Sequence, residues 1–375
     1  MLLALGGAAD AALAEGSAAS GIDEIEVIGQ RPTYRISETS TATKTPTRLI
    51  DIPQSLTLIG SGMIRDQAMQ NMGDVVRYVP GVQMAQGEGH RDAPIFRGNT
   101  STADFFVDGM RDDTQYYRDL YNVEQVEVLK GPSGMIFGRG GSGGLINRVT
   151  KQADGMNLQE FGATLGSWED RRLTADVGRA IGDGSAFRVN AFYEDSESYR
   201  NFGKLNRWAI NPTFTLERSD ATRVTLGYER FEDERVTDRG IPSQLPLLGL
   251  PLETGASTFF GSPDSSPTSA TVDAFASTVT HDFSDHLTLT NKTRLADYDK
   301  FYQNVFPGAY SAADGRVSVS GYSNRTAREN LLNQTDVTFS AETAGVSHTV
   351  LSGMELGRQH TDNFRQTAYF TAVGS

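Results

Sequence analysis

The feature that most constrains the fold of this 375-residue chain is an alternation of apolar and polar residues through its second half. From about residue 155 onward the alternation has a period of two, which places successive side chains on opposite faces of a strand. The runs cover residues 161–165, 173–177, 187–193, 208–216, 224–228, 272–279, 287–298, 331–339 and 346–356. The pattern predicts about nine strands, many of them about 10 residues long or longer.

The connections between these runs alternate in length. Tight turns are expected at residues 182–184, 218–220 and 284–285, whereas residues 234–270 form a connection of roughly 35 residues. Long strands joined by short turns on one side and by longer loops on the other are typical of outer-membrane β-barrels. A soluble β-sandwich is the alternative, but its strands are usually about five or six residues long. The second half is therefore predicted to form an antiparallel transmembrane β-barrel.

About nine or ten strands do not close a barrel of the width that such loops indicate. An open sheet edge in lipid would leave backbone groups without hydrogen-bond partners, at a cost of several kcal/mol each. We therefore expect the barrel to be incomplete in this sequence, and the chain to be an N-terminal fragment of a longer protein.

Charge and composition exclude several classes of function. The formal net charge is −13, which argues against a nucleic-acid partner. The chain has no cysteine, so disulfides, thiolate catalysis and thiolate metal sites are excluded. No apolar run approaches the length of about 18 residues that a transmembrane helix needs. Residues 1–20 hold an apolar run and the segment Ala12-Leu13-Ala14, which favour a clipped signal peptide over a plain disordered tail.

A glycine-rich segment raises the possibility of a nucleotide site. Gly138, Gly140 and Gly143 match the pattern G-x-G-x-x-G, but a dinucleotide turn must open a helix, and residues 145–150 resemble a strand. An oxidoreductase built on this segment is the weaker hypothesis. The alternative is a tight turn that lets two backbone segments approach closely. No arrangement of catalytic residues with a recognisable context occurs, so the chain is not predicted to be an enzyme.

The first half has a different pattern. Residues 48–151 alternate short strands and short helices interrupted by Pro and Gly, which predicts a compact α+β domain. One helix is expected within residues 71–81, with Asn71 as its N-cap, Asp74 in its first turn and Pro80-Gly81 at its end.

Five ordered motifs in this half resemble the plug domain of TonB-dependent outer-membrane receptors. They are DIPQS (51–55), YVPGV (78–82), IFRG (95–98), FVDG (106–109) and VEVLKGP (126–132), which is followed by FGRG (137–140) and GGLINRVTK (143–151). The segments RDAP (91–94) and YYRDLYN (116–122) are most similar to catecholate-siderophore receptors of the Fiu type.

In this family the plug lies inside a barrel of about 22 strands. The resemblance implies an α+β plug domain followed by an incomplete antiparallel transmembrane β-barrel, with about 9–10 of those 22 strands present. The implied divisions are a signal or disordered segment (1–20), a TonB box and linker (21–47), the plug domain (48–152) and the N-terminal part of the barrel (153–375).

The resemblance also implies a function. The protein would be a monomer in the outer membrane of a Gram-negative bacterium, where it binds and imports a ferric siderophore of the catecholate type. TonB and its inner-membrane complex would supply the energy. The iron arrives already chelated, so no cofactor and no protein metal site are expected, and the five histidines show no metal-binding spacing. A receptor for a hydroxamate siderophore, cobalamin or a saccharide is the alternative.

Three plug loops, at residues 86–93, 99–104 and 110–117, would face outward and contact the ligand. Arginines there would offset the negative charge of a ferric catecholate, Gln115 would hydrogen-bond, and tyrosines would stack or donate. The candidate ligand-binding residues are His90, Arg91, Thr100, Arg111, Gln115, Tyr116 and Tyr117.

A short N-terminal segment resembles the TonB box. It comprises Asp23, Glu24, Ile25, Glu26, Val27 and Ile28. As an extended segment it could add as a strand to the sheet edge of a partner, whereas the alternative is a disordered leader with no partner.

The resemblance places Arg97 and Lys130 at family positions that face the barrel wall, where they are expected to pair with carboxylates of the wall. Arg139 and Arg148 could serve similarly, and ordinary hydrogen bonding to plug loops is the alternative for these two.

Overall fold

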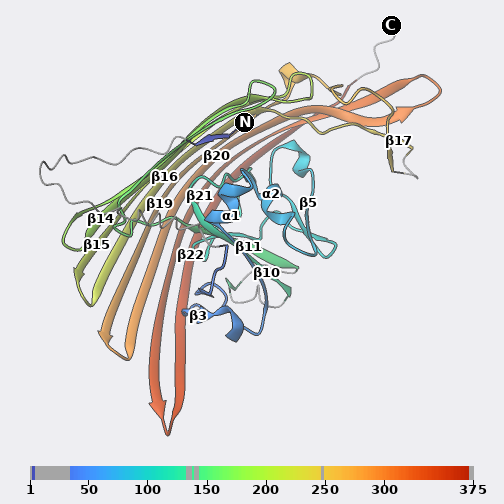
Figure 1. The fold of residues 1–375 in the computed structure, drawn as a ribbon. Coiled ribbons are helices and arrows are strands. Elements are labelled where there is room, and N and C mark those ends of the chain that lie inside the picture. Colours follow the sequence, from blue (N-terminus) through green and yellow to red (C-terminus); the bar gives the residue numbers. More distant parts are fainter. Residues whose placement is uncertain (1, 5–33, 132–136, 139–142, 246–248, 371–375) are drawn as a thin grey trace, which may run out of the picture.

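The computed structural model describes residues 2–4, 34–131, 137–138, 143–245 and 249–370. These residues form a large, strongly curved antiparallel sheet, which we call the wall, and a smaller α+β body, which we call the plug (Figure 1). The plug lies against the concave face of the wall.

Nine long strands of the wall follow one another in sequence order, each antiparallel to the next. This confirms the predicted number and positions of the strands. The short strand β1 (Leu2–Ala4) pairs with β12 at one edge of the sheet, and β22 forms the other edge. The nine are β12 (Leu158–Leu165), β13 (Arg171–Gly182), β14 (Ser185–Glu197), β15 (Lys204–Ser219), β16 (Thr222–Val236), β19 (Pro267–Ser284), β20 (Leu287–Ser311), β21 (Arg316–Thr343) and β22 (Val346–Ala368).

The two faces of the wall differ in chemistry, as the alternation requires. Leu173 of β13 is 57% exposed on the convex face, whereas the adjacent Arg172 is 6% exposed and faces the plug. Tyr193 and Ile210 continue the apolar convex face on β14 and β15. An apolar outer face and a polar inner face are the pattern of a transmembrane β-barrel.

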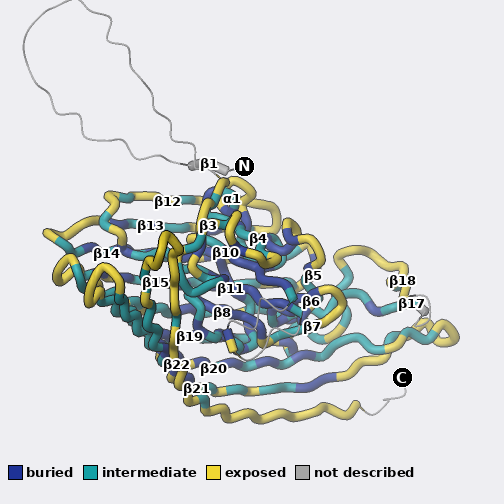
Figure 2. Tube along the Cα trace, turned by 90° about the horizontal axis from the view of Figure 1, so that it is seen from below, coloured by how far each residue is buried: buried dark blue, intermediate teal, exposed yellow. Residues whose placement is uncertain are grey.

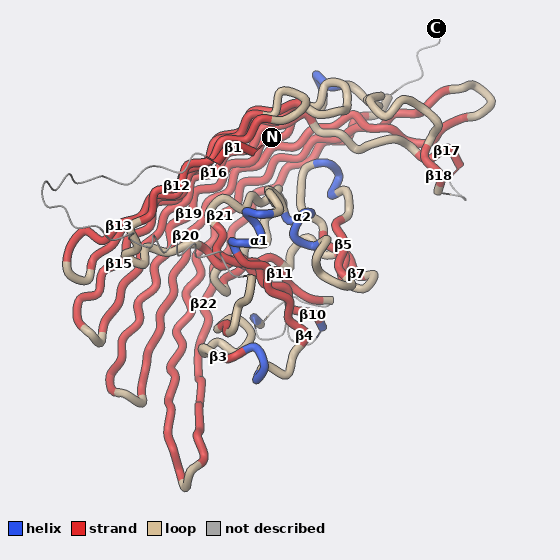
Figure 3. Tube along the Cα trace, in the orientation of Figure 1, coloured by secondary structure: helices blue, strands red, loops and turns tan. Residues whose placement is uncertain are grey.

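The connections of the wall confirm the predicted asymmetry (Figure 3). One end of the sheet has tight turns near residues 183–184, 220–221, 285–286 and 344–345. The other end has the longer loops, of which residues 237–266 form the longest. That loop contains a small hairpin of β17 (Ser243–Leu245) and β18 (Leu250–Pro251) and the 3-10 turn η4 (Pro263–Ser265).

The plug is built on a five-stranded mixed sheet in the order β4-β10-β11-β8-β9, with β11 and β8 parallel. These strands are β4 (Ser55–Gly60), β8 (Phe105–Val107), β9 (Met110–Arg111), β10 (Val123–Lys130) and β11 (Gly144–Thr150). Smaller sheets pair β5 (Val82–Met84), β6 (Pro94–Phe96) and β7 (Asn99–Thr100), and join β2 (Glu38–Thr39) to β3 (Thr47–Arg48). The helical elements are η1 (Leu49–Asp51), α1 (Ser61–Asp66), α2 (Met72–Val76) and η2 (Gly87–Gly89).

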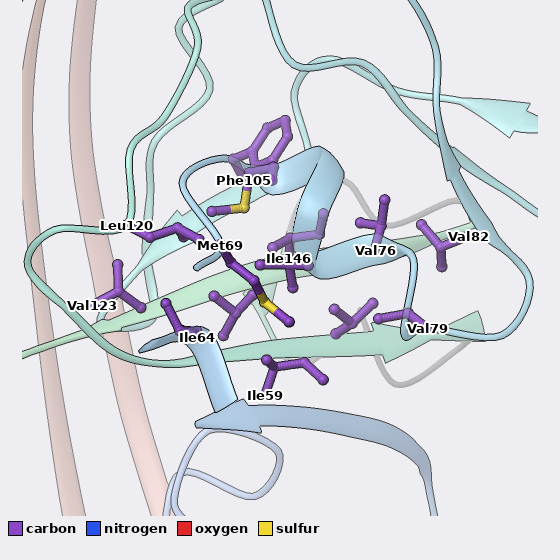
Figure 4. Packing of buried hydrophobic residues seen from close by; sticks show 14 of the residues in the cluster. Ile59, Ile64, Met69, Val76, Val79, Val82, Phe105, Leu120, Val123 and Ile146 are labelled. Atoms are coloured by element: carbon purple, nitrogen blue, oxygen red, sulfur yellow. The ribbon is translucent and has the colours of Figure 1, made fainter. Parts of the chain in front are cut away.

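The two α-helices cover one face of the plug sheet and enclose its hydrophobic core (Figure 4). Ile59, Ile64, Val76 and Ile146 are all buried in this core. Figure 2 shows that burial is concentrated in the plug sheet and on the parts of the wall strands that face it. None of the helices in the described part of the chain is long and apolar enough to cross a membrane.

Helix α2 begins as predicted but ends early. The side chain of Asn71 accepts a hydrogen bond from the backbone N–H of Asp74 at 3.1 Å, which confirms Asn71 as the N-cap. The helix ends at Val76 rather than at Pro80, because the next residues form tighter turns in which the N–H of Val79 donates to Val76.

The glycine-rich segment serves close packing. It connects β10 to β11, which are antiparallel neighbours, whereas a dinucleotide turn connects a strand to a helix. A Cβ atom on Gly143 would lie 2.7 Å from Cβ of Phe96, and one on Gly144 would lie 2.5 Å from the carbonyl oxygen of Leu129. Glycine is therefore required because other parts of the plug approach this backbone too closely for a side chain.

Candidate functional site

A cavity of about 520 Å³ lies between two plug segments and the inner face of the wall. The plug contributes residues around η2 and the segment after β9, and the wall contributes β20, β21 and β22. The cavity lies toward the longer loops, because Gln86 beside η2 donates from Nε2 to the carbonyl oxygen of Asp238 at 3.0 Å. The lining residues are Glu88, His90, Arg91, Asp113, Thr114, Gln115, Lys300, Tyr302, Tyr322, Asn324, Thr326, Arg328, Thr361, Asn363 and Arg365.

The conformation of η2 projects Glu88 toward the wall. Gly87, Glu88 and Gly89 all have positive φ, at 63°, 58° and 76°, which produces a tight left-handed turn. A Cβ atom on Gly89 would lie 2.4 Å from the carbonyl oxygen of Asp238, so only glycine fits against the long loop. The carboxylate of Glu88 accepts a hydrogen bond from Tyr322 at 2.7 Å and lies 3.3 Å from Arg239.

Cations outnumber carboxylates around the cavity. The guanidinium groups of Arg91, Arg328 and Arg365 face two carboxylates, Glu88 and Asp113. Nη1 of Arg91 lies 3.1 Å from Glu88, and Nη2 of Arg328 lies 2.6 Å from Asp113. A concave surface with excess positive charge attracts anions.

Two titratable groups of the plug have strongly shifted pKa values here. Hydrogen bonding with His90 and Tyr322, together with the charges of Arg91 and Arg239, holds the pKa of Glu88 well below its ordinary range despite partial burial. Burial, reinforced by the positive charges of Lys300 and Arg91, lowers the pKa of His90 to about 3. Glu88 is therefore an anion and His90 is neutral at neutral pH.

The structure brings three of the seven candidate ligand residues together at this cavity. His90, Arg91 and Gln115 line it, and Nη1 of Arg91 donates to Oε1 of Gln115 at 2.9 Å. Nδ1 of His90 lies 2.5 Å from Nζ of Lys300, which also donates to the backbone oxygen of Gln115.

The other four candidates do not line the cavity. Thr100 is exposed on β7, and Nη1 of Arg111 donates to Ala103 at 3.4 Å. Tyr116 is only 3% exposed, because its ring packs in the cluster that joins plug to wall, and its hydroxyl donates to Asp112 at 3.0 Å. The hydroxyl of Tyr117 donates to the backbone oxygen of Gln86 at 3.2 Å.

The described residues that were expected to pair with carboxylates of the wall do not do so. Arg97 is exposed, and Nζ of Lys130 donates within the plug, to Pro80 at 3.3 Å and Thr57 at 3.4 Å. Neither forms an ion pair with the wall within the described ranges. Arg139 and the TonB-box residues 23–28 lie outside the described residues.

Several ion pairs between plug and wall have the opposite polarity from the one expected, with the carboxylate on the plug, whereas Arg65–Glu160 and Lys151–Asp176 have the expected polarity. Asp119 of the plug lies 2.7 Å from Arg172 of β13 and 3.1 Å from Arg207 of β15, and Asp113 pairs with Arg328 of β21. Sequence reasoning missed these wall cations. Their signal was available, since each occupies a polar position of the alternation and therefore faces the plug.

A second, fully buried network lies beneath the cavity. The carboxylate of Asp112 accepts hydrogen bonds from Arg118 at 2.9 Å, Arg148 at 2.8 Å and the hydroxyl of Tyr298 at 3.0 Å. Burial by itself would raise the pKa of Asp112, but the two arginines outweigh it and hold the pKa well below its ordinary range. Burial raises the pKa of Asp92 to about 6, because its effect is larger than the opposing effect of the positive charge of Arg118.

The described residues contain no group of three or more His, Cys, Asp or Glu side chains that could hold a metal ion.

Comparisons with known proteins agree with this architecture. The model of the TonB-dependent Receptor Plug Domain matches residues 48–145. A probable TonB-dependent receptor, BfrD of Bordetella pertussis, is 33% identical over 93% of this chain and 49% of its own length. The catecholate siderophore receptor Fiu of Escherichia coli K12 is 30% identical over 91% of this chain and 48% of its own length.

Solved structures share the fold. The siderophore receptor PiuA from Acinetobacter baumannii superposes with a TM-score of 0.83 at 28% identity, covering 89% of this chain and 49% of that one. The open form of the ferric-catecholate import receptor Fiu from E. coli K12 gives a TM-score of 0.77 at 28% identity, over 86% and 51%. The chain spans about half the length of the curated relatives it matches. The plug, the curved wall around it and the similarity along nine-tenths of its length show that this chain belongs to the TonB-dependent receptors of the outer membrane.

Proposed function

We propose that this protein binds a ferric siderophore of the catecholate type at the outer face of its plug and imports it across the outer membrane. The observation that carries the proposal is the cavity between plug and wall, where the guanidinium groups of Arg91, Arg328 and Arg365 converge. A ferric tris-catecholate is a compact trianion with aromatic faces, and such a ligand suits a cationic cavity. The name of the relative Fiu, a catecholate siderophore receptor, also supports this class of cargo, and the name of PiuA supports a siderophore.

Different lining residues contact different parts of the ligand. The guanidinium groups of Arg91, Arg328 and Arg365 offset the charge and donate hydrogen bonds to catecholate oxygens. Tyr322, whose ring packs on the buried ring of Tyr302 with the centroids 4.9 Å apart, is the candidate aromatic contact for a catechol ring. The iron remains in its chelate throughout, so it is cargo and the chain itself performs no chemistry on it.

Transport requires an energy source outside this chain. We propose that residues 23–28 pair as a strand with a sheet edge of TonB, which then pulls on the plug. Ile25→Pro is expected to abolish uptake while leaving binding unchanged, because Pro removes a backbone donor needed for strand pairing. Unchanged uptake in that variant would overturn the assignment of the TonB box.

The ligand class is tested by equilibrium binding of ferric tris(catecholate), a trianion, to the purified full-length protein. Arg91→Gln and Arg365→Gln are each expected to weaken binding about 10-fold or more, because each removes a charge-assisted contact to the anion. Arg171→Gln, on the convex face, is the matched control and should change nothing.

A different cargo would give a different result. Tight binding of a neutral iron hydroxamate, with no binding of the trianion, would overturn the catecholate assignment and favour the alternative cargo.

A further inference from the structure

We propose that an anionic ligand in this cavity competes with the plug's own carboxylates for the wall cations, so that binding exchanges ion pairs and releases the outer rim of the plug. The inference rests on the proposed function. It states how ligand binding at the same site changes the ion pairs that attach the plug to the wall.

Two of the cations that line the cavity, Arg328 and Arg91, already pair with carboxylates of the plug. Nη2 of Arg328 lies 2.6 Å from Oδ1 of Asp113, and Glu88 lies 3.1 Å from Arg91 and 3.3 Å from Arg239 of the long outer loop. The carboxylates therefore occupy the donor groups that an anion would use. A ligand can gain these donors only by displacing Asp113 and Glu88.

These pairs are accessible to a ligand. The side chains of Asp113 and Arg328 are 13% and 17% exposed, and that of Glu88 is 28% exposed. All three line the cavity. Partly exposed pairs are individually weak, so a multivalent anion can replace them.

The ion pairs of Asp119 with the wall are beyond the reach of a ligand. The side chain of Asp119 is 0% exposed and that of its partner Arg172 is 6% exposed, and neither lines the cavity. Breaking a pair of this kind is costly. Ligand binding therefore frees the segments that carry Glu88 and Asp113 while Asp119 continues to hold the plug, which leaves the larger part of the work to the energised partner.

The test is the affinity of the full-length protein for two probes of similar size. Ferric tris(catecholate) is a trianion, and ferric tris(acetohydroxamate) is neutral. Asp113→Asn removes the competing carboxylate without changing the shape of the side chain. It is expected to tighten binding of the trianion about three- to fivefold and to leave the neutral probe unchanged. Glu88→Gln provides a second variant with the same expectation, and Asp285→Asn, in an exposed turn at the far end of the wall, is the control.

A double-mutant cycle separates competition for Arg328 from simple charge repulsion. If Asp113 competes for Arg328, the gain from Asp113→Asn disappears in an Arg328→Gln background. A gain that persists there, or weaker binding of the trianion by both carboxylate variants, would overturn the exchange. Failure of the unmodified protein to bind either probe would overturn the proposed function and the exchange together.

Discussion

Arg172 of the wall forms hydrogen bonds to the carboxylate of Asp119 of the plug through both of its terminal nitrogens. Nη2 donates to Oδ1 at 2.7 Å and Nη1 donates to Oδ2 at 2.9 Å, and both side chains are almost completely buried. Two parallel hydrogen bonds between a guanidinium and a carboxylate fix the relative orientation of the groups as well as their distance. The pair therefore sets how the plug is seated against β13.

Removing this arginine should loosen the plug. We expect Arg172→Met to lower the free energy of unfolding by about 3–5 kcal/mol, because it leaves Asp119 and Glu194 to share the single cation of Arg207. The measurement is urea unfolding of the purified protein. Arg171→Met, one residue away on the convex face, should shift the value by less than about 0.5 kcal/mol. Equal effects of the two variants would contradict the seating role.

A buried hydroxyl contributes to anchoring the linker before the plug. Oγ1 of Thr39 donates to Oε1 of Glu127 at 2.5 Å, and the carboxylate of Glu127 is buried. Thr39→Val removes this donor and should destabilise the local structure by about 1–3 kcal/mol. Amide hydrogen exchange of residues 38–48 should accelerate, whereas the exposed neighbour variant Ser40→Ala should leave it unchanged. Exchange that is equally slow in both variants would argue against the anchor.

Acidification should weaken the plug through His90. Its pKa falls from an ordinary 6.5 to about 3 in the folded protein, so the stability that the neutral ring contributes is complete above about pH 6.5. That contribution is lost as the pH falls from 6.5 toward 3, because in this range His90 binds a proton in the unfolded chain but not in the folded protein. The thermal midpoint of His90→Asn should therefore fall less steeply over this range than that of the unmodified protein. His286→Asn, in an exposed turn, should keep the original slope.

Two glycines near the β10–β11 connection should differ sharply in tolerance. Gly144→Ala would drive its Cβ against the carbonyl oxygen of Leu129 at 2.5 Å, and we expect a loss of about 2–4 kcal/mol. Gly138 has a φ of 79° with no atom within 4 Å of an added Cβ, so Gly138→Ala should cost only about 1 kcal/mol. Thermal unfolding of both variants checks the difference, and a larger loss for Gly138→Ala would contradict the packing explanation.

Local patterns predicted the elements well but the contacts less well. The N-cap of Asn71 and the nine wall strands depend on residues adjacent in the chain, and both were predictable. The assignment of Tyr116 to an outward-facing loop missed that its ring is buried between Phe231 and Tyr298. A tyrosine in a polar loop gives no local sign of which wall strand will cover it.

The sequence by itself determined the strand count, the polarity of each face of the wall and the plug motifs, because a period of two follows from the covalent geometry of an extended chain. Only the tertiary structure decided which charges meet. Glu88 reaches Tyr322, and Asp113 reaches Arg328, across more than 200 residues of chain. These contacts depend on the curvature of the whole sheet and on the position of the plug against it. Neither the curvature nor the position can be predicted from residues adjacent in the chain.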